Sequence, residues 1–118
     1  MANMVTLGLK AKYSVWRSKQ MNESDFEAQL RADGYTEIET QNLDPRPVKG
    51  RHRHLFAIRS LVLSGTFNVT QDGEPVTFGP GQVFAVAYGE LHDESIGAEG
   101  ARVLIGRKFS KTEPSAGL

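Results

Sequence analysis

The chain has 118 residues, 14 of them basic and 14 acidic, so its formal net charge is zero and it has no cysteine. These features exclude disulfides and thiolate ligands, and they disfavour a nucleic acid or an anionic membrane as a partner. No apolar segment approaches the roughly 20 residues that span a bilayer. The N-terminus also lacks the pattern of a secretory signal, so we expect a cytoplasmic protein with a single globular domain.

The first part of the chain is predicted to hold an arm and one helix. Residues 1–20 show no strong periodicity and are interpreted as an N-terminal arm. A helix is predicted over residues 24–33. Its signals are a capping box, an apolar pair four residues apart and a terminating glycine (Ser24 with Glu27, Phe26 with Leu30, and Gly34).

From Tyr35 onward, short runs of apolar and β-branched residues alternate with turn residues. About eight short strands spaced by about 8–12 residues predict a β-sandwich or barrel. Asp72-Gly73 indicates a hairpin, and a further turn is predicted at 97–100. The predicted strands cover residues 35–43, 51–59, 60–71, 76–78 and 82–87, a segment with Leu91 and His92, and 101–109. We expect one domain over 21–109 and a flexible tail over 110–118.

The chain contains only three histidines, and their spacing favours a metal site. His52 and His54 are two residues apart, and side chains with this spacing point to the same face of a strand. His92 follows the turn at 88–90. Two imidazoles from one strand and a third from a neighbouring strand can form the open three-ligand site of a catalytic metal.

The residues around the histidines resemble the two motifs of the cupin superfamily, which are small β-barrels of jelly-roll type. The matching positions are His52, His54 and Gly65 in the first motif, and Gly81, Gly89 and His92 in the second. The resemblance covers about residues 44–108. It implies an all-β fold, a double-stranded β-helix or jelly-roll barrel, with the short N-terminal helix packed outside.

The chain departs from the cupin motifs at several positions. Ile58 or Arg59, depending on the spacer, stands where the first motif has a glutamate, and Arg46 replaces that motif's leading glycine. Ala87 and Ile96 replace a proline and an asparagine of the second motif. Without the glutamate, the resemblance implies a metal site made of the three histidines alone, with neutral ligands.

Three neutral imidazoles would leave the full charge of a divalent ion at the site and make it a strong Lewis acid. We expect one divalent transition metal: Zn, Fe, Ni, Mn or Cu. A redox metal would suit chemistry on dioxygen and a chelating substrate, whereas zinc would suit hydrolytic or lyase-type chemistry. The predicted function is therefore a metal-dependent enzyme acting on a small organic molecule, of dioxygenase, isomerase or lyase type.

Three further residues are candidate catalytic groups, each with a plainer alternative. Arg59 would clamp an anionic substrate if a bulge turned it inward, whereas strict alternation puts it on the face opposite the histidine pair. Glu94 is favoured over Asp93 as a general base or an extra ligand, because it shares the face of His92; the alternative is a surface carboxylate. Tyr88 would contribute a hydroxyl to a pocket or simply pack at the turn.

Two other functions and a partner follow from the same pattern. The barrel would also suit a small-molecule sensor without catalysis, or a metal-free binding or storage protein. The basic residues Lys49, Arg51 and Arg53 would either gather an anionic ligand or form a solvated face. A homodimer is expected, because small cupins are commonly dimers and the arm carries Tyr13 and Trp16.

Overall fold

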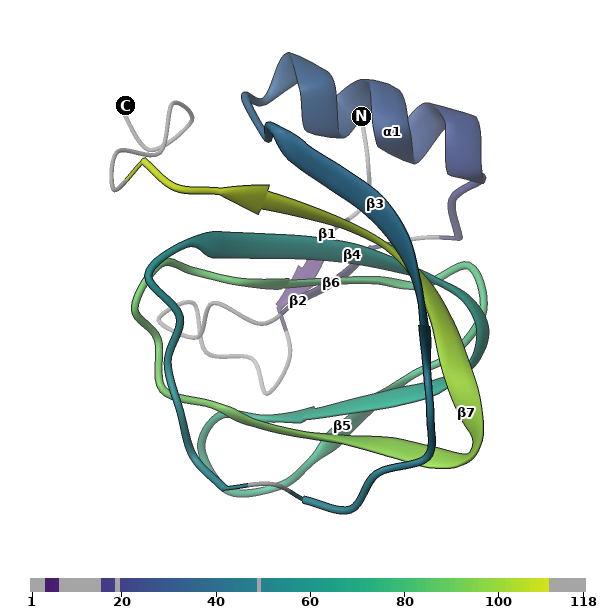
Figure 1. Cartoon of the computed structure of the whole chain (residues 1–118), viewed down its shortest axis with the longest axis vertical. Coiled ribbons are helices and arrows are strands. Elements are labelled where there is room, and N and C mark those ends of the chain that lie inside the picture. Colours follow the sequence, from purple (N-terminus) through teal and green to yellow (C-terminus); the bar gives the residue numbers. More distant parts are fainter. Residues whose placement is uncertain (1–3, 7–15, 19, 49, 111–118) are drawn as a thin grey trace.

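A computed structural model describes residues 4–6, 16–18, 20–48 and 50–110, the first two segments by their backbone alone. The predicted tail beyond residue 110, and most of the predicted arm with Tyr13, lie outside the described residues. The described elements are β1 (Met4–Thr6), β2 (Trp16–Ser18), α1 (Glu23–Ala32), β3 (Glu37–Leu43), β4 (Ala57–Thr70), β5 (Val76–Phe78), β6 (Val83–Val86) and β7 (Asp93–Lys108) (Figure 1).

The strands form an antiparallel barrel, as the sequence predicts. The main sheet has the order β3-β7-β4-β5, and β6 pairs with β4; β1 and β2 form a separate two-stranded sheet. The predicted hairpin at Asp72-Gly73 is confirmed, because Val69 of β4 pairs with Val76 of β5 across it. In the part of the chain that the structure describes, no helix is long and apolar enough to cross a membrane.

Two expectations about the strands are wrong. The predicted turn at 97–100 does not separate two strands, since β7 runs without interruption from Asp93 to Lys108. The predicted strands at 51–59 and 60–71 are one strand, β4, which begins only at Ala57. Both long strands bend around the barrel, so each contributes to two of its walls (Figure 1).

Two glycines form the corner where β4 and β7 bend together. Gly65 has a φ of +75°, and a Cβ there would lie 1.9 Å from the carbonyl oxygen of Gly100. Gly100 itself has a φ of +78°, and a Cβ there would lie 2.8 Å from the carbonyl oxygen of Leu43. Residues with a side chain are disfavoured at such φ values and cannot approach a backbone so closely. The register of β4 and β7 shifts beside this corner, as at a β-bulge.

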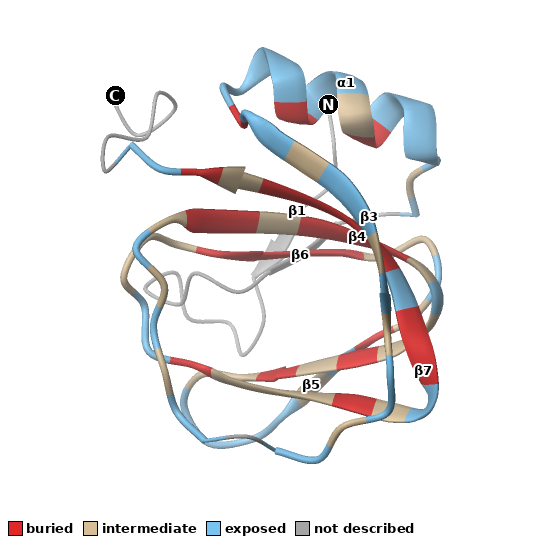
Figure 2. Ribbon diagram, in the orientation of Figure 1, coloured by how far each residue is buried: buried red, intermediate tan, exposed pale blue. Residues whose placement is uncertain are grey.

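Helix α1 covers the outer face of the barrel wall formed by β4 and β7 (Figures 1 and 2). As predicted, Phe26 and Leu30 are its buried residues. The predicted capping box is wrong, because Asn22 is the N-cap and its side chain accepts a 2.9 Å hydrogen bond from the Asp25 amide. The Ser24 hydroxyl donates to the same Asn22 oxygen. Because Asn22 is the N-cap, the helix begins at Glu23, one residue earlier than expected.

Alternation along β4 and β7 separates two apolar clusters. Leu61 and Leu104 point outward and pack with Phe26 and Leu30 under the helix. The second cluster fills the barrel. It contains Ile58, Val62, Phe67, Val69, Phe78, Phe84, Val86, Ile96, Ala101, Val103 and Ile105. The inner face of the barrel is therefore apolar along most of its length.

Candidate metal centre

The structure brings the three predicted histidines together at one end of the barrel. His52 and His92 pair as an antiparallel bridge, with two backbone hydrogen bonds of 2.9 Å. Their ring centroids are 4.5 Å apart, and the ring of His54 lies 4.9 Å from His52 and 5.1 Å from His92. His92 is 1% exposed, so the cluster is anchored inside the protein.

A carboxylate stands among these rings. Oε2 of Glu94 lies 3.1 Å from Nε2 of His92 and 3.5 Å from Nε2 of His52. Single donor atoms from His52, His54, His92 and Glu94 all lie within 4.8 Å of one another. Glu94 reaches this point because it is two residues beyond His92 and shares its face of the chain. The group that could hold a metal ion thus contains one carboxylate beside the three histidines, at the residue considered above as an extra ligand.

Arg46 holds the other oxygen of this carboxylate. Its Nη2 donates a 2.9 Å hydrogen bond to Oε1 of Glu94, and the backbone bridge between Arg46 and Ile96 places the two side chains together. Oε2 is left facing the histidines. The sequence analysis missed this role, because the contact depends on a pairing between segments 50 residues apart and no spacing in the sequence signals it.

Backbone carbonyls orient two of the rings. Nδ1 of His52 lies 2.9 Å from the carbonyl oxygen of Gly50, and Nδ1 of His92 lies 3.0 Å from that of Glu90. A carbonyl oxygen only accepts, so in a neutral ring the proton resides on Nδ1 and Nε2 presents its lone pair. Both lone pairs then point toward the Glu94 carboxylate, and a cation among these electron-rich atoms would stabilise the arrangement.

Without a metal, a proton on His92 would provide the positive charge. Burial would lower the pKa of His92, but the hydrogen bond to Glu94 and the bond to the Glu90 carbonyl outweigh it and raise this pKa above its ordinary value. Burial would likewise raise the pKa of Glu94, yet the hydrogen bond from His92 and the nearby positive charges lower it to about 2. The site therefore holds a carboxylate that stays charged at neutral pH.

The residues present also fit a metal ion. Nε2 of His52 is buried without a hydrogen-bond partner among the described residues. A buried nitrogen of this kind calls for an explanation, and a bound metal ion would supply its missing partner. Two ligand atoms about 2.1 Å from a tetrahedral ion lie about 3.4 Å apart. The two distances from Glu94 to the histidine nitrogens, 3.1 Å and 3.5 Å, bracket this value. Imidazole and carboxylate together suit zinc and the divalent ions of iron, nickel and manganese.

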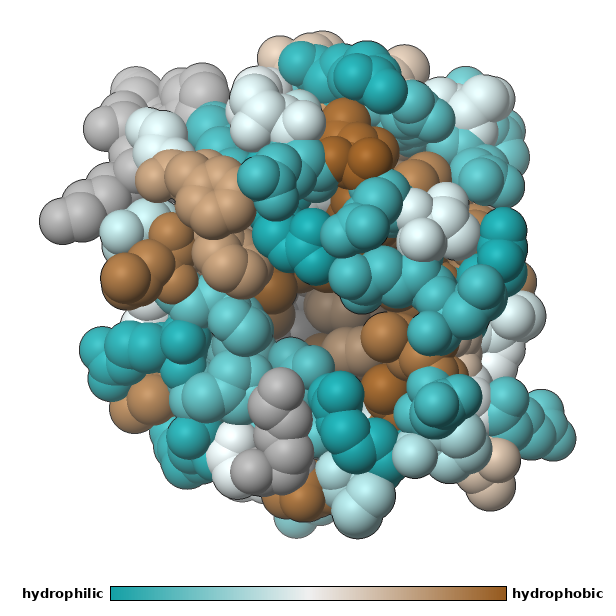
Figure 3. All heavy atoms as spheres, viewed as in Figure 1, coloured by the Kyte–Doolittle hydropathy of each residue, from teal (hydrophilic) through white to brown (hydrophobic). Residues whose placement is uncertain are grey.

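A cavity of about 150 Å³ adjoins the cluster, inside the barrel. His54, His92, Glu94 and Arg46 lie at its polar end, and Phe56, Phe67 and Phe84 are among the apolar side chains of its wall. Figure 3 shows the face of the molecule hollowed near its centre, with hydrophobic residues inside the hollow and hydrophilic ones around it. The candidate metal centre thus borders a space that can hold a small molecule.

Neither a scan against protein-family models nor a search of curated proteins gives a match. Solved structures do match. The dTDP-4-dehydrorhamnose 3,5-epimerase of Elizabethkingia anophelis has a TM-score of 0.59 at 13% identity, over 91% of this chain and 74% of that one. An RmlC-like cupin from Shewanella frigidimarina has a TM-score of 0.53 at 14% identity, over 94% of this chain and 86% of that one. The chain has the cupin fold.

A third neighbour is matched over nearly its whole length. A protein of unknown function from Rhizobium leguminosarum has a TM-score of 0.56 at 22% identity, and the match covers 76% of this chain and 97% of that one. The identities show the shared fold and carry no activity to this chain.

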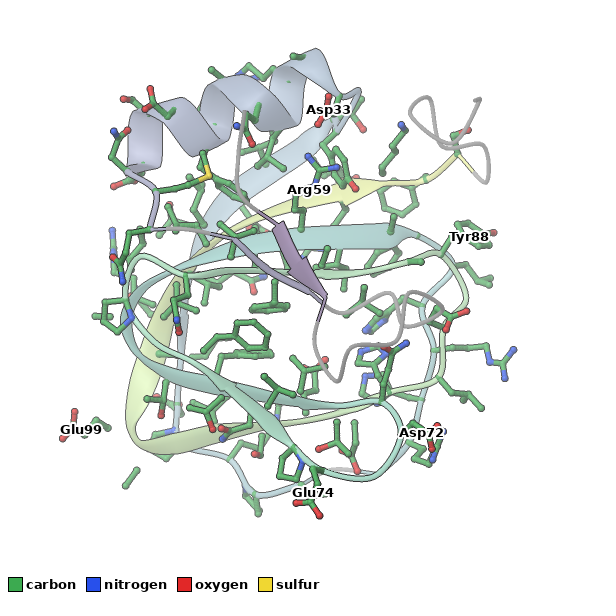
Figure 4. The ribbon with its side chains drawn as sticks, turned by 180° about the vertical axis from the view of Figure 1, so that it is seen from behind. Asp33, Arg59, Asp72, Glu74, Tyr88 and Glu99 are labelled. Carbon is green, nitrogen blue, oxygen red and sulfur yellow. The ribbon has the colours of Figure 1, made fainter. Side chains whose placement is uncertain are left out.

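The structure places two other predicted site residues, Arg59 and Tyr88, away from the cavity that adjoins the histidine cluster. Arg59 follows strict alternation: it points to the outside of β4, forms a 2.6 Å ion pair with Asp33 beyond α1 and lies over the ring of Tyr35 (Figure 4). The inward position considered for it is therefore not adopted. Tyr88 is half-buried at the rim of the barrel and does not line the cavity (Figure 4).

The predicted basic face also lies outside the cavity. Arg51 and Arg53 are exposed and border a separate surface depression with Gln71, Asp72 and Glu90, as expected for residues that alternate with the inward histidines. Lys49 lies outside the described residues. The arginines that line the cavity are instead Arg46 and Arg107, and sequence reasoning had singled out neither.

Proposed function

We propose that this cupin is a metal-dependent enzyme acting on a small organic molecule, with His52, His54, His92 and Glu94 as the metal ligands. One observation carries the proposal: four donor atoms within 4.8 Å of one another at the end of an internal cavity. A divalent metal there would supply Lewis-acid chemistry to an oxygen-bearing substrate, and a redox metal would add electron-transfer chemistry.

The state of Glu94 supports a ligand role rather than a general base. A general base works best with a pKa near the operating pH, whereas the pKa of Glu94 is about 2. A permanently charged carboxylate, held through its other oxygen by Arg46, is suited to bind a cation. Arg46 is then a positioning residue, because it directs Oε2 of Glu94 toward the histidines.

The size of the cavity limits the substrate. A cavity of about 150 Å³ in a protein interior accepts a molecule of about the size of benzene. The epimerase neighbour acts, by its name, on a nucleotide-linked sugar, which is far larger than this space. We therefore propose a small compact substrate for this chain, and we carry over from the neighbour only the general use of the barrel for small molecules.

Metal analysis tests the proposal. The protein, purified without a polyhistidine tag, is expected to contain close to one equivalent of a first-row transition metal by plasma mass spectrometry. His92→Asn and Glu94→Gln should lower this content several-fold. Arg53→Ala is the matched control, because Arg53 lies between two ligands in sequence but is exposed. Circular dichroism of each variant separates metal loss from unfolding.

The metal found would select the chemistry to screen. Iron or copper directs the screen to oxygen consumption with small chelating substrates, and zinc directs it to hydrolysis, elimination or isomerisation. If the protein takes up none of Zn²⁺, Fe²⁺, Ni²⁺, Mn²⁺ or Cu²⁺ in titrations, the proposal is wrong. Tight binding of a small molecule without metal would then favour the sensing or storage function, in which a proton on His92 satisfies Glu94.

Two further predictions concern the whole molecule. We propose that the chain forms a homodimer in the cytoplasm, on the basis of the cupin resemblance and the pattern of the N-terminus. Light scattering coupled to gel filtration should give twice the monomer mass of 13.0 kDa. A monomer at micromolar concentration would contradict the proposed homodimer. Localisation of a tagged full chain checks the proposed cytoplasmic location.

A further inference from the structure

Ser60 presents an unpaired hydroxyl inside the barrel. It is 0% exposed, and its Oγ has no hydrogen-bond partner among the described residues. It also lines the cavity that adjoins the metal centre. A buried polar group without a partner costs about 1–3 kcal/mol, so such a group in a site usually serves something that binds there.

Ser60 lies at a different part of the cavity from the histidines. His54, Phe56, Ile58 and Ser60 alternate along one inward-facing row, so the aromatic ring and the aliphatic side chain separate the hydroxyl from the cluster. Ser60 pairs with Phe84 of β6 and Ile105 of β7, which are both apolar. The hydroxyl thus lies between apolar neighbours in the sheet, on a wall that is mostly apolar but also includes Gln41 and Arg107.

The wall between these two ends suits a flat apolar body. Phe67 and Phe84 stack with ring centroids 4.7 Å apart, and Phe56 stacks on His54 at 4.8 Å. All three phenylalanines line the cavity, whose volume of about 150 Å³ matches a benzene-sized group. Arg46 contributes a buried Nε without a partner at the opposite, polar end. That end suits an anionic head group.

We propose that the cavity binds a small carboxylate with a benzene-sized apolar body, whose distal oxygen forms a hydrogen bond with Oγ of Ser60. The inference rests on the proposed function, since the carboxylate head lies at the metal centre and beside Arg46. Ser60 is then a specificity-determining residue: it distinguishes ligands with an oxygen at the far end from ligands without one. A site built to hydrogen-bond an oxygen rejects the analogue that lacks it.

Two matched pairs of acids test the proposal. Benzoate is compared with 4-hydroxybenzoate, and phenylacetate with 4-hydroxyphenylacetate, by calorimetric titration of the zinc-loaded full chain. In at least one pair the hydroxylated acid should bind about five- to tenfold more tightly. Ser60→Ala should abolish this ratio and Ser60→Thr should retain it. Ser64→Ala is the matched control, because Ser64 is exposed on the same strand.

A second measurement separates ligand recognition from a structural role. The thermal midpoint of ligand-free Ser60→Ala should equal or exceed that of the wild type, because the substitution removes no hydrogen bond within the described protein. A lowered midpoint would overturn the inference in favour of a structural role. A ratio of one in both pairs, a ratio that survives Ser60→Ala, or no binding of any of the four acids would also overturn it. Zinc titration before acid is added tests the proposed function separately.

Discussion

Replacing Glu94 with glutamine tests the electrostatics of the site directly. The substitution keeps the shape of the side chain and removes its negative charge. In the metal-free protein, Glu94 bonds to Arg46 through one oxygen and to His92 through the other, at 2.9 Å and 3.1 Å. Glutamine cannot balance either positive charge. We expect Glu94→Gln to destabilise the metal-free protein.

The size of the effect follows from the pKa of Glu94. Its fall from 4.5 to about 2 corresponds to about 3 kcal/mol of favourable interaction with the charged form. Removing one partner of a fully buried ion pair costs about 3–5 kcal/mol. Arg46 is 34% exposed and can regain water, so we expect a loss of about 2–3 kcal/mol near pH 6. In a domain of this length, that lowers the thermal midpoint by roughly 10 °C.

The stability difference between the wild type and Glu94→Gln should depend on pH, and the two pKa shifts give its direction. The lowered pKa of Glu94 means that its contribution is complete above about 4.5 and is lost as the pH falls toward 2. The raised pKa of His92 means that its contribution is complete below 6.5 and is lost as the pH rises through the higher folded value. The stability difference between wild type and Glu94→Gln should therefore be largest between about pH 4.5 and 6.5.

Chemical denaturation of the metal-free protein in the presence of a chelator measures this profile from pH 3 to 9. Glu99→Gln is the matched control, because Glu99 is exposed on the same strand and lies far from the cluster (Figure 4). It should change the free energy of unfolding by less than about 0.5 kcal/mol at every pH. A Glu94→Gln difference that is absent near pH 6, or equal at pH 6 and pH 9, would refute the reasoning.

Three other predictions follow from the structure. Arg46→Gln should raise the pKa of Glu94 only a little above about 2, because the charge of Arg46 is the smallest of the causes that lower it and the contacts with His92 and His52 remain; carbon NMR of the side-chain carboxyl measures this pKa, and an unchanged value would contradict the electrostatic contact between Arg46 and Glu94. Arg59→Ala should leave zinc affinity unchanged, because Arg59 forms an ion pair with Asp33 on the outer face of the barrel. A several-fold change of the zinc affinity in a titration would contradict this outer position. Gly65→Ala should lower the free energy of unfolding in urea by about 3 kcal/mol, since its Cβ would overlap the Gly100 carbonyl, and a loss well below 1 kcal/mol would show that the corner relaxes.

The histidine cluster was predictable because it depends on a local rule and one strand pairing. The two-residue spacing of His52 and His54 sets a shared face, and the spacing of the cupin motifs brings His92 beside them. The same rule separates outward Arg59 from the inward row. Alternation is reliable here because the inner face is filled with apolar side chains, so a slip of one residue would expose it to solvent.

Other features depended on contacts that the sequence does not encode locally. Glycines at 97 and 100 look like a turn, yet Gly100 serves a bend within β7 because it packs against the bend of β4 at Gly65. Asn22 and Ser24 are both good helix caps, and Asn22 takes this position directly after Met21, whose amide donates a hydrogen bond to the distant Gly81 carbonyl. Neither choice follows from composition or periodicity.

The carboxylate of the candidate metal site shows why matching a motif position by position is insufficient. The glutamate of the first cupin motif follows the histidine pair, at a position where this chain has either Ile58, which lines the cavity, or Arg59, which points outward. The negative charge comes instead from Glu94 on β7, two residues from His92. A dication with one carboxylate leaves a net charge of +1, compared with +2 for three histidines alone, and Arg46 beside Glu94 adds a further positive charge. An electropositive end facing an apolar wall favours a ligand that is anionic at one end and apolar along its body.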